Sequence, residues 1–191
     1  MTIHDVKTKT AHRGTSKQEW LETALKALSE RGIAGVKVES LAQSLGIARA
    51  GFYWHFKNRD NLLRQLLDYW VHEQTEKVTA NPVLLTLEPT ERLTEAAEMI
   101  TKYKLGRYDM AIRQWASTDA RAARIVRKVN RIRLDFVRDA FRELGFTGDD
   151  LEMRAMLFVC YHAWEVSTFQ EISRKRLRGL IAKRIELLTK R

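Results

Sequence analysis

The stretch that decides the fold is residues 39–56, which read ESLAQSLGIARAGFYWHF. Its first half, residues 39–45, has leucines at helical spacing and ends at Gly46, a residue type that accepts the positive φ with which helices often end. Its second half, residues 49–56, has two phenylalanines four positions apart, on one face of a second short helix. Two short helices joined by a turn that contains glycine are typical of a helix-turn-helix.

Two longer amphipathic segments flank this stretch. Before it, apolar residues from Trp20 to Leu28 recur every three or four positions. Ser16 is expected to cap that helix, with Glu19 as the second member of a capping box. After it, an apolar stripe predicts a connecting helix over about residues 59–78. We therefore expect an arm at residues 1–15, a three-helix domain over residues 16–60 and a second domain over residues 61–191.

Composition favours an all-α fold throughout. The chain of 191 residues is 45% hydrophobic, with only 2 prolines and 9 glycines, too few for a sandwich with many turns. The segment between Asn81-Pro82 and Glu88-Pro89 is expected to be a loop. The periodicity beyond it predicts helices over about residues 90–104, 109–116, 119–144, 149–170 and 174–190.

Charge and cysteine content narrow the class of protein further. The formal net charge of +10 favours a polyanionic partner such as nucleic acid. Cys160 is the only cysteine, so an intrachain disulfide is impossible, which suits a reducing compartment. The apolar run at residues 155–164 is too short to span a bilayer. We expect a cytoplasmic protein without a membrane partner.

The run RAGFYWHFKNR, residues 49–59, combines rings and cations in a way that suits DNA. If the two phenylalanines anchor the helix, Arg49 lies at the helix start, where side chains reach base edges and arginine pairs with guanine. The flanking polar groups are suited to phosphate contacts, which position a protein without reading sequence. These groups belong to Tyr53, Trp54 in part, His55, Lys57 and Arg59.

Residues 16–64 resemble the DNA-binding domain of the tetracycline-repressor (TetR) family of bacterial regulators. The strings VESLAQSLGI and ARAGFYWHFKNRDNLL carry the resemblance. It implies that Arg49, Ala50 and Gly51 read bases. It also implies phosphate contacts for Tyr53, His55, Lys57 and Arg59, with Lys37 near the start of the first motif helix. Gly51 departs from the Thr or Ser of many members, and Glu39 stands where a cation or polar group is common.

The resemblance also implies a homodimer and a ligand-binding second domain. The helices at about residues 149–170 and 174–190 are expected to form a four-helix bundle with a second copy. An unidentified apolar or aromatic effector is expected to act on the connecting helix and release double-stranded operator DNA. Candidate pocket residues, for which a plain core position is an equal alternative, are Met99, Tyr103, Met110, Trp115, Met156, Phe158, Tyr161 and Trp164.

Other readings of the chain remain open. A regulator of the same fold that responds to no ligand, or to a protein partner, is the first alternative. A helical enzyme is the second, although no nucleotide loop or nucleophile with its base is found. Asp68, His72 and Glu76 lie on one helix face, where a solvated pairing is favoured over a metal site. No metal and no cofactor are expected.

Overall fold

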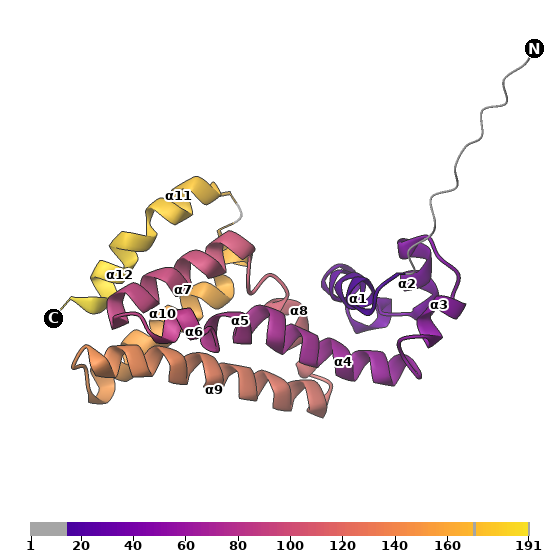
Figure 1. The fold of residues 1–191 in the computed structure, drawn as a ribbon, viewed down its shortest axis with the longest axis horizontal. Coiled ribbons are helices and arrows are strands. Elements are labelled where there is room, and N and C mark those ends of the chain that lie inside the picture. Colours follow the sequence, from indigo (N-terminus) through magenta and orange to yellow (C-terminus); the bar gives the residue numbers. More distant parts are fainter. Residues whose placement is uncertain (1–14, 170, 191) are drawn as a thin grey trace, which may run out of the picture.

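The computed structural model describes residues 15–169 and 171–190, and every regular element in these ranges is helical (Figure 1). The expected arm at residues 1–15 lies outside the described ranges except for Thr15. The elements are α1 (Lys17–Arg31), a 3-10 turn (Ile33–Gly35), α2 (Val38–Leu45), α3 (Ala50–Tyr53), α4 (Arg59–Val71), a π-helical segment (His72–Glu76), α5 (Lys77–Thr79), α6 (Pro82–Leu85), α7 (Pro89–Tyr103), α8 (Asp109–Ala116), α9 (Ala120–Glu143), α10 (Gly148–Thr168), α11 (Arg174–Gly179) and α12 (Ile181–Thr189).

The local signals at the start of α1 act as expected. The Ser16 hydroxyl accepts a hydrogen bond from the backbone N–H of Glu19, and the Glu19 carboxylate accepts one from the backbone N–H of Ser16. Two backbone N–H groups that lack a helical partner are thereby satisfied. The capping box sets where α1 begins.

Three expected elements differ in the structure. The second motif helix, expected over residues 49–56, is regular only over Ala50–Tyr53. The expected loop at residues 81–89 contains the short helix α6, with Asn81 as its N-cap. The single helix expected over residues 174–190 is divided at Leu180 into α11 and α12. Helix ends are hard to place from periodicity alone. At Leu180 the apolar stripe continues across the break, because one residue hardly changes which face of a helix is apolar.

Two hydrophobic cores share the long helix α9. The first holds α1 to α4 together and also includes Ile112 and Trp115 of α8 and Val126 of α9. The second lies between α7, α10, α12 and the C-terminal half of α9, with Phe141 fully buried in it. The helix-turn-helix unit is therefore packed directly onto the second half of the molecule.

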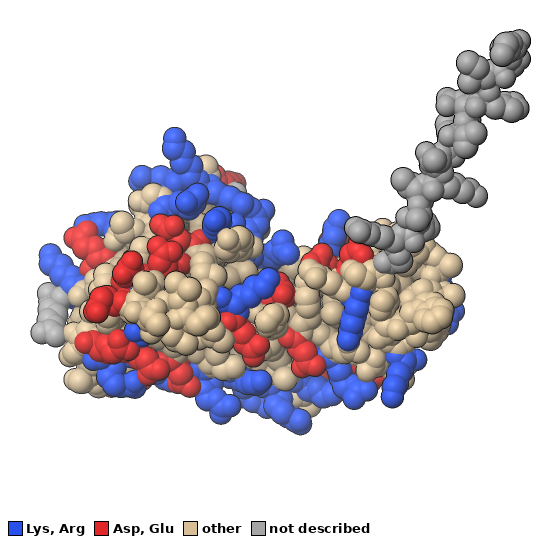
Figure 2. All heavy atoms as spheres, viewed as in Figure 1, with Lys and Arg blue, Asp and Glu red and all other residues tan. Residues whose placement is uncertain are grey.

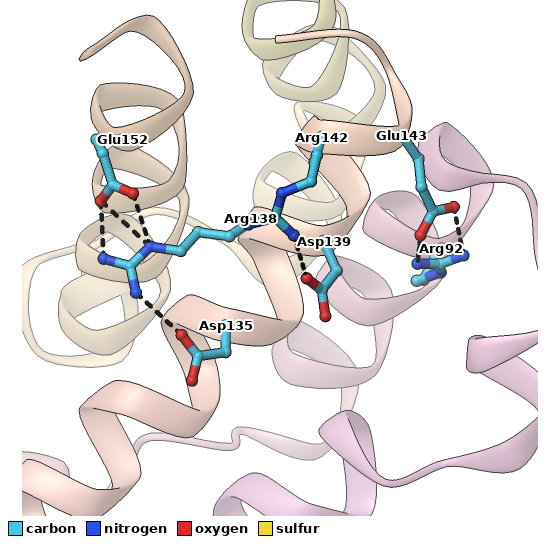
Figure 3. A network of polar contacts seen from close by, with 7 residues as sticks. All are labelled: Arg92, Asp135, Arg138, Asp139, Arg142, Glu143 and Glu152. Carbon is cyan, nitrogen blue, oxygen red and sulfur yellow. Dashed lines mark hydrogen bonds and ion pairs between the residues drawn. The ribbon is translucent and has the colours of Figure 1, made fainter. Parts of the chain in front are cut away.

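Ion pairs fix the C-terminal half of α9 against its neighbours (Figure 3). The Arg138 guanidinium donates to both oxygens of Glu152 on α10, at 2.7 to 3.2 Å. Arg92 of α7 donates to both oxygens of Glu143 at 2.9 and 3.0 Å, and Arg92 is buried. Two-pronged arginine–carboxylate pairs restrict orientation as well as distance. They hold α7, α9 and α10 in register.

Candidate functional site

The turn between α2 and α3 presents one face of α3 to solvent. Gly46 ends α2 with φ 67°, in the left-handed region, as its position predicted. Phe52 and Phe56 are buried, and the Phe52 ring packs edge-on against Trp20 of α1 with centroids 5.4 Å apart. These anchors turn the opposite face of α3 outward.

The outward face carries the residues expected to touch DNA. Arg49, Ala50, Tyr53, Trp54 and Lys57 are exposed, as is Lys37 at the N-cap of α2. The Trp54 side chain is 87% exposed, an unusual placement for an indole without a partner surface. Gly51 is half-buried, and a Cβ there would lie in ordinary contact, 3.5 Å from Ile47. The structure thus leaves six of the expected residues accessible to solvent around α2 and α3.

Arg49 is oriented by two neighbours. Its guanidinium forms an ion pair with Glu39 at 2.8 Å and donates to the Tyr53 hydroxyl at 3.0 Å. The hydrogen bond to Tyr53 is the largest cause of a raised pKa for Arg49. Both members of the Arg49–Glu39 pair are more than half exposed, so the pair contributes little and can exchange for another partner. Glu39, the departure noted in the sequence, restrains the arginine at the helix start.

Two expected phosphate contacts are engaged with the protein's own backbone. The Arg59 Nε donates to the carbonyl of Val36 at 2.6 Å, and its Nη2 donates to the carbonyl of Ile33 at 2.7 Å. The His55 Nε2 lies 2.7 Å from the carbonyl of Thr15. Spacing alone could not reveal this, because Val36 and Ile33 are more than 20 positions from Arg59. The Arg59 contacts hold the segment between α1 and α2 against the start of α4, and the His55 contact ties the end of α3 to the residue before the α1 cap.

A second candidate site is a small cavity between the connecting helix, α7, α9 and α10. Its volume is about 50 Å³. The lining consists of Gln74, Thr75, Val78, Thr79, Ala96, Ile100, Leu105, Gly106, Arg133, Phe136, Val137, Phe158, Val159, His162 and Ala163. A void of this size holds a few water molecules and is smaller than the roughly 150 Å³ that admits benzene. A larger ligand requires the walls to move apart.

Only Phe158 of the eight candidate pocket residues lines this cavity. Trp115 lies in the first core, and Met99 packs at the edge of the second. Tyr103, Met110, Met156 and Trp164 are 45% to 54% exposed, and Tyr161 lies beneath the Arg184 guanidinium, 4.0 Å from it. The other seven lie outside this cavity, because aromatic and methionine content does not say which side of a helix faces the interior. Their role in a ligand pocket stays a prediction.

One wall of the cavity is polar, although an apolar or aromatic effector was expected from the sequence. Arg133 forms an ion pair with the buried Asp109 and donates to the Thr75 hydroxyl at 3.0 Å. Asp109 also accepts from the indole N–H of Trp70 at 3.1 Å. The Gln74 side-chain oxygen accepts from the backbone N–H of Gly106 at 2.9 Å. Arg133 thereby ties the π-helical segment to α8 and α9.

The connecting helix extends from the helix-turn-helix to the cavity. The apolar stripe of this helix covers Leu62–Val71. It was expected to face a pocket, and it packs in the first core instead. The residues that reach the cavity lie further along, at positions 74, 75, 78 and 79. The π-helical segment at His72–Glu76 falls at this place, and such segments are frequent at functional sites.

Of three further polar side chains, His72, Cys160 and His162, only His162 lines the cavity. His72 lies 3.5 Å from Glu76 in an i,i+4 pair, the solvated pairing favoured for that face. No cluster of metal-binding side chains is found among the described residues. His162 is buried: its Nδ1–H donates to the Phe158 carbonyl at 2.7 Å, and its Nε2 accepts from Arg184 at 3.0 Å. Cys160 is exposed on α10.

These features define a helix-turn-helix protein with a second helical domain. Residues 21–66 match the family model described as bacterial regulatory proteins, tetR family. Over 51 residues the chain is 41% identical to the class D tetracycline repressor protein of Escherichia coli, a stretch that covers 27% of this chain and 23% of that protein. The helix-turn-helix part of the chain is therefore similar to bacterial regulatory proteins of the tetR family. Its sequence matches span less than a quarter of the length of the first curated relatives.

Solved structures extend the likeness of the fold to nearly the whole chain. The regulator FadR from Bacillus subtilis, in complex with stearoyl-CoA, aligns with a TM-score of 0.67 at 16% identity, over 92% of this chain and 98% of FadR. AibR, in complex with isovaleryl coenzyme A and operator DNA, aligns with a TM-score of 0.64 at 19% identity, over 87% and 96%. At these identities the comparison establishes the all-helical fold.

None of the helices in residues 15–169 and 171–190 combines the length and apolar composition needed to cross a membrane.

Proposed function

We propose that this chain is a homodimeric, sequence-specific DNA-binding repressor that a small ligand releases from its operator. The observation that carries the proposal is the outward face of α3, where Arg49, Tyr53 and Trp54 lie together on buried phenylalanine anchors. Apolar anchors inside and polar tips outside suit insertion into a major groove. Such a protein acts on DNA in the cytoplasm and needs no catalytic residues.

In this proposal the residues of the interface have separate roles. Arg49 reads a guanine, with Ala50 and Gly51 close to the base edges. Tyr53, Trp54 and Lys57 contact the phosphate backbone, and Lys37 does so at the start of α2. Arg59 holds the segment before α2 and His55 lies against Thr15 before α1, instead of serving as primary phosphate contacts. The operator is an inverted repeat, because a two-fold dimer binds two half-sites about one helical turn or more apart.

Release follows from the position of the cavity. A ligand larger than about 50 Å³ must displace its walls, which include four residues of the connecting helix. The helix begins at Arg59, next to the recognition unit, and Arg133 holds the cavity end through Thr75. Movement at one end changes the spacing of the two recognition helices in a dimer. We propose an acyl-thioester effector, since two proteins of this fold bind acyl-CoA compounds.

The test of DNA binding uses retardation of the DNA upstream of the coding region. Arg49→Ala should weaken binding by about 1–3 kcal/mol per half-site and relax the preference at one base pair. Glu39→Gln is the matched control, because it removes the partner of Arg49 and a charge that repels phosphate. It should bind equally well or more tightly. An equal loss on specific and random DNA would assign Arg49 to phosphate.

A second candidate function is a DNA-binding regulator of the same fold without a small ligand. The small volume of the cavity favours it. Titration of a ligand with and without operator separates the two, since a releasing ligand must bind more weakly in the presence of DNA by the factor with which it weakens DNA binding.

A further inference from the structure

Two neighbouring depressions lie where the C-terminal end of α7 meets α11. Their volumes are about 500 Å³ and about 250 Å³, and Thr101 and Arg174 line both. Together we call them the basic hollow, because five cationic side chains line it. These are Lys102, Lys104, Arg174, Lys175 and Arg178.

The charges of the basic hollow are poorly compensated. Within residues 15–169 and 171–190, no carboxylate forms an ion pair with any of the five cations. Two carboxylates line the hollow, Glu98 and Glu165. Glu165 is buried and accepts a hydrogen bond from the Thr101 hydroxyl at 3.2 Å. Figure 2 shows the resulting group of Lys and Arg side chains over α11.

The basic hollow adjoins the apolar cavity. Ile100 lines the cavity and Thr101, the next residue, lines the hollow. Lys104 lines the hollow and Leu105, the next residue, lines the cavity. The end of α7 is therefore a thin wall with apolar side chains on one side and cations on the other. A ligand with an apolar chain and an anionic end fits this arrangement.

We propose that the basic hollow binds the phosphate groups of an effector whose apolar chain enters the cavity. The chemical class is an acyl thioester of a phosphorylated carrier such as coenzyme A. Arginine presents a fork of N–H donors that matches phosphate oxygens, and lysine contributes point charges. Five cations match the charge of a ligand with several phosphate groups better than the charge of a ligand with one carboxylate. This inference rests on the proposed ligand-released function and adds the residues that select the ligand's charged part.

The experiment measures ligand affinity calorimetrically, in the absence of DNA, for the full chain. The site variant is Arg174→Gln, Lys175→Gln and Arg178→Gln combined. The control variant is Arg124→Gln, Arg127→Gln and Lys128→Gln, which removes the same kinds and number of exposed charges from α9. The probes are decanoyl-CoA, decanoate and coenzyme A alone. Thermal unfolding of each variant verifies that the fold is kept, as expected for exposed positions.

The site variant should lose roughly tenfold or more in affinity for decanoyl-CoA, as three lost surface ion pairs require. Its affinity for coenzyme A should also fall, and its affinity for decanoate should stay unchanged. The control variant should bind all three probes like the unaltered chain. Three outcomes would each overturn the proposal. They are an equal loss of affinity in both variants, an equal loss of affinity for decanoate, and no binding of decanoyl-CoA by the unaltered chain. Operator retardation, measured separately, decides whether the DNA-binding function stands.

Discussion

At the scale of single residues, two neighbouring cations of the helix-turn-helix make different contacts. Lys57 and Arg59 are two positions apart, and both are exposed cations next to α3. The Arg59 guanidinium is held by two backbone carbonyls, whereas no side-chain contact of Lys57 is found among the described residues. Residue type and spacing suggest the same role for both, but the hydrogen bonds separate them.

This difference predicts opposite effects of two alanine substitutions. Arg59→Ala removes two charge-assisted hydrogen bonds and should lower the free energy of unfolding by about 1–2 kcal/mol. Lys57→Ala should change stability by less than about 0.5 kcal/mol but lower the slope of log K against log salt for DNA binding by about one unit. Urea unfolding and binding at several salt concentrations measure the two effects. If Arg59→Ala lowers the salt slope and leaves stability unchanged, Arg59 is a phosphate contact.

At the scale of elements, α10 carries the buried imidazole of His162 against Arg184 of α12. Burial, followed by the nearby Arg184, lowers the pKa of His162 to about 3. The imidazole is therefore neutral in the folded chain near pH 7. Burial also raises the pKa of the Glu165 carboxyl, one turn further along α10. The two shifts act in opposite directions on stability as the pH falls.

The direction in which His162 changes stability with pH follows from proton binding. Between the folded pKa of about 3 and the unfolded value of 6.5, the unfolded chain binds the proton and the folded chain does not. His162 therefore lowers stability as the pH falls below 6.5, by about 1 kcal/mol at pH 5.5. His162→Gln should lose less stability than the unaltered chain between pH 7.5 and 5.5, measured by urea unfolding. The Glu165 contribution is common to both. Parallel pH profiles of the two proteins would contradict this assignment.

At the scale of the whole molecule, the helices expected to form the dimer contact differ in the apolar side chains that they expose. The apolar stripe of the C-terminal helices is used within the chain, since Leu177, Ile181 and Ile185 are buried. α10 instead exposes Met153, Met156 and Leu157 at 48% to 56%. Positions three and four apart share a helix face, so these side chains form an apolar patch. We propose that this face of α10 forms the contact with the second copy, with α12 at its side.

A charged substitution in that patch tests the dimer. Leu157→Glu should shift the chain from dimer to monomer at micromolar concentration, because two carboxylates would face each other across a two-fold axis. Sedimentation equilibrium measures the change. Val83→Glu is a suitable control, since Val83 is 65% exposed and lies on α6, outside the proposed contact. A dimer of unchanged strength with Leu157→Glu would place the interface elsewhere.

Much of the architecture could be predicted from local patterns. The cap at Ser16, the turn at Gly46 and the inward phenylalanines follow from backbone geometry and helical spacing, which involve neighbours in sequence. The connecting helix and α8 were also located by periodicity, and α8 has the expected bounds, Asp109–Ala116. The outward position of Arg49 followed from the anchors on the other side of its helix.

Local spacing in the sequence was enough to predict the all-α fold, the resemblance to the tetR family and the residues expected to contact DNA, because each depends on neighbours along the chain. Only the tertiary structure decided which side of each later helix faces inward. It showed that Trp115 belongs to the first core, that Arg133 lines the cavity, and that Arg59 holds a distant backbone segment. The physical reason is that an amphipathic stripe defines a buried face but not the partner that buries it, and contacts between distant residues leave no period in the sequence.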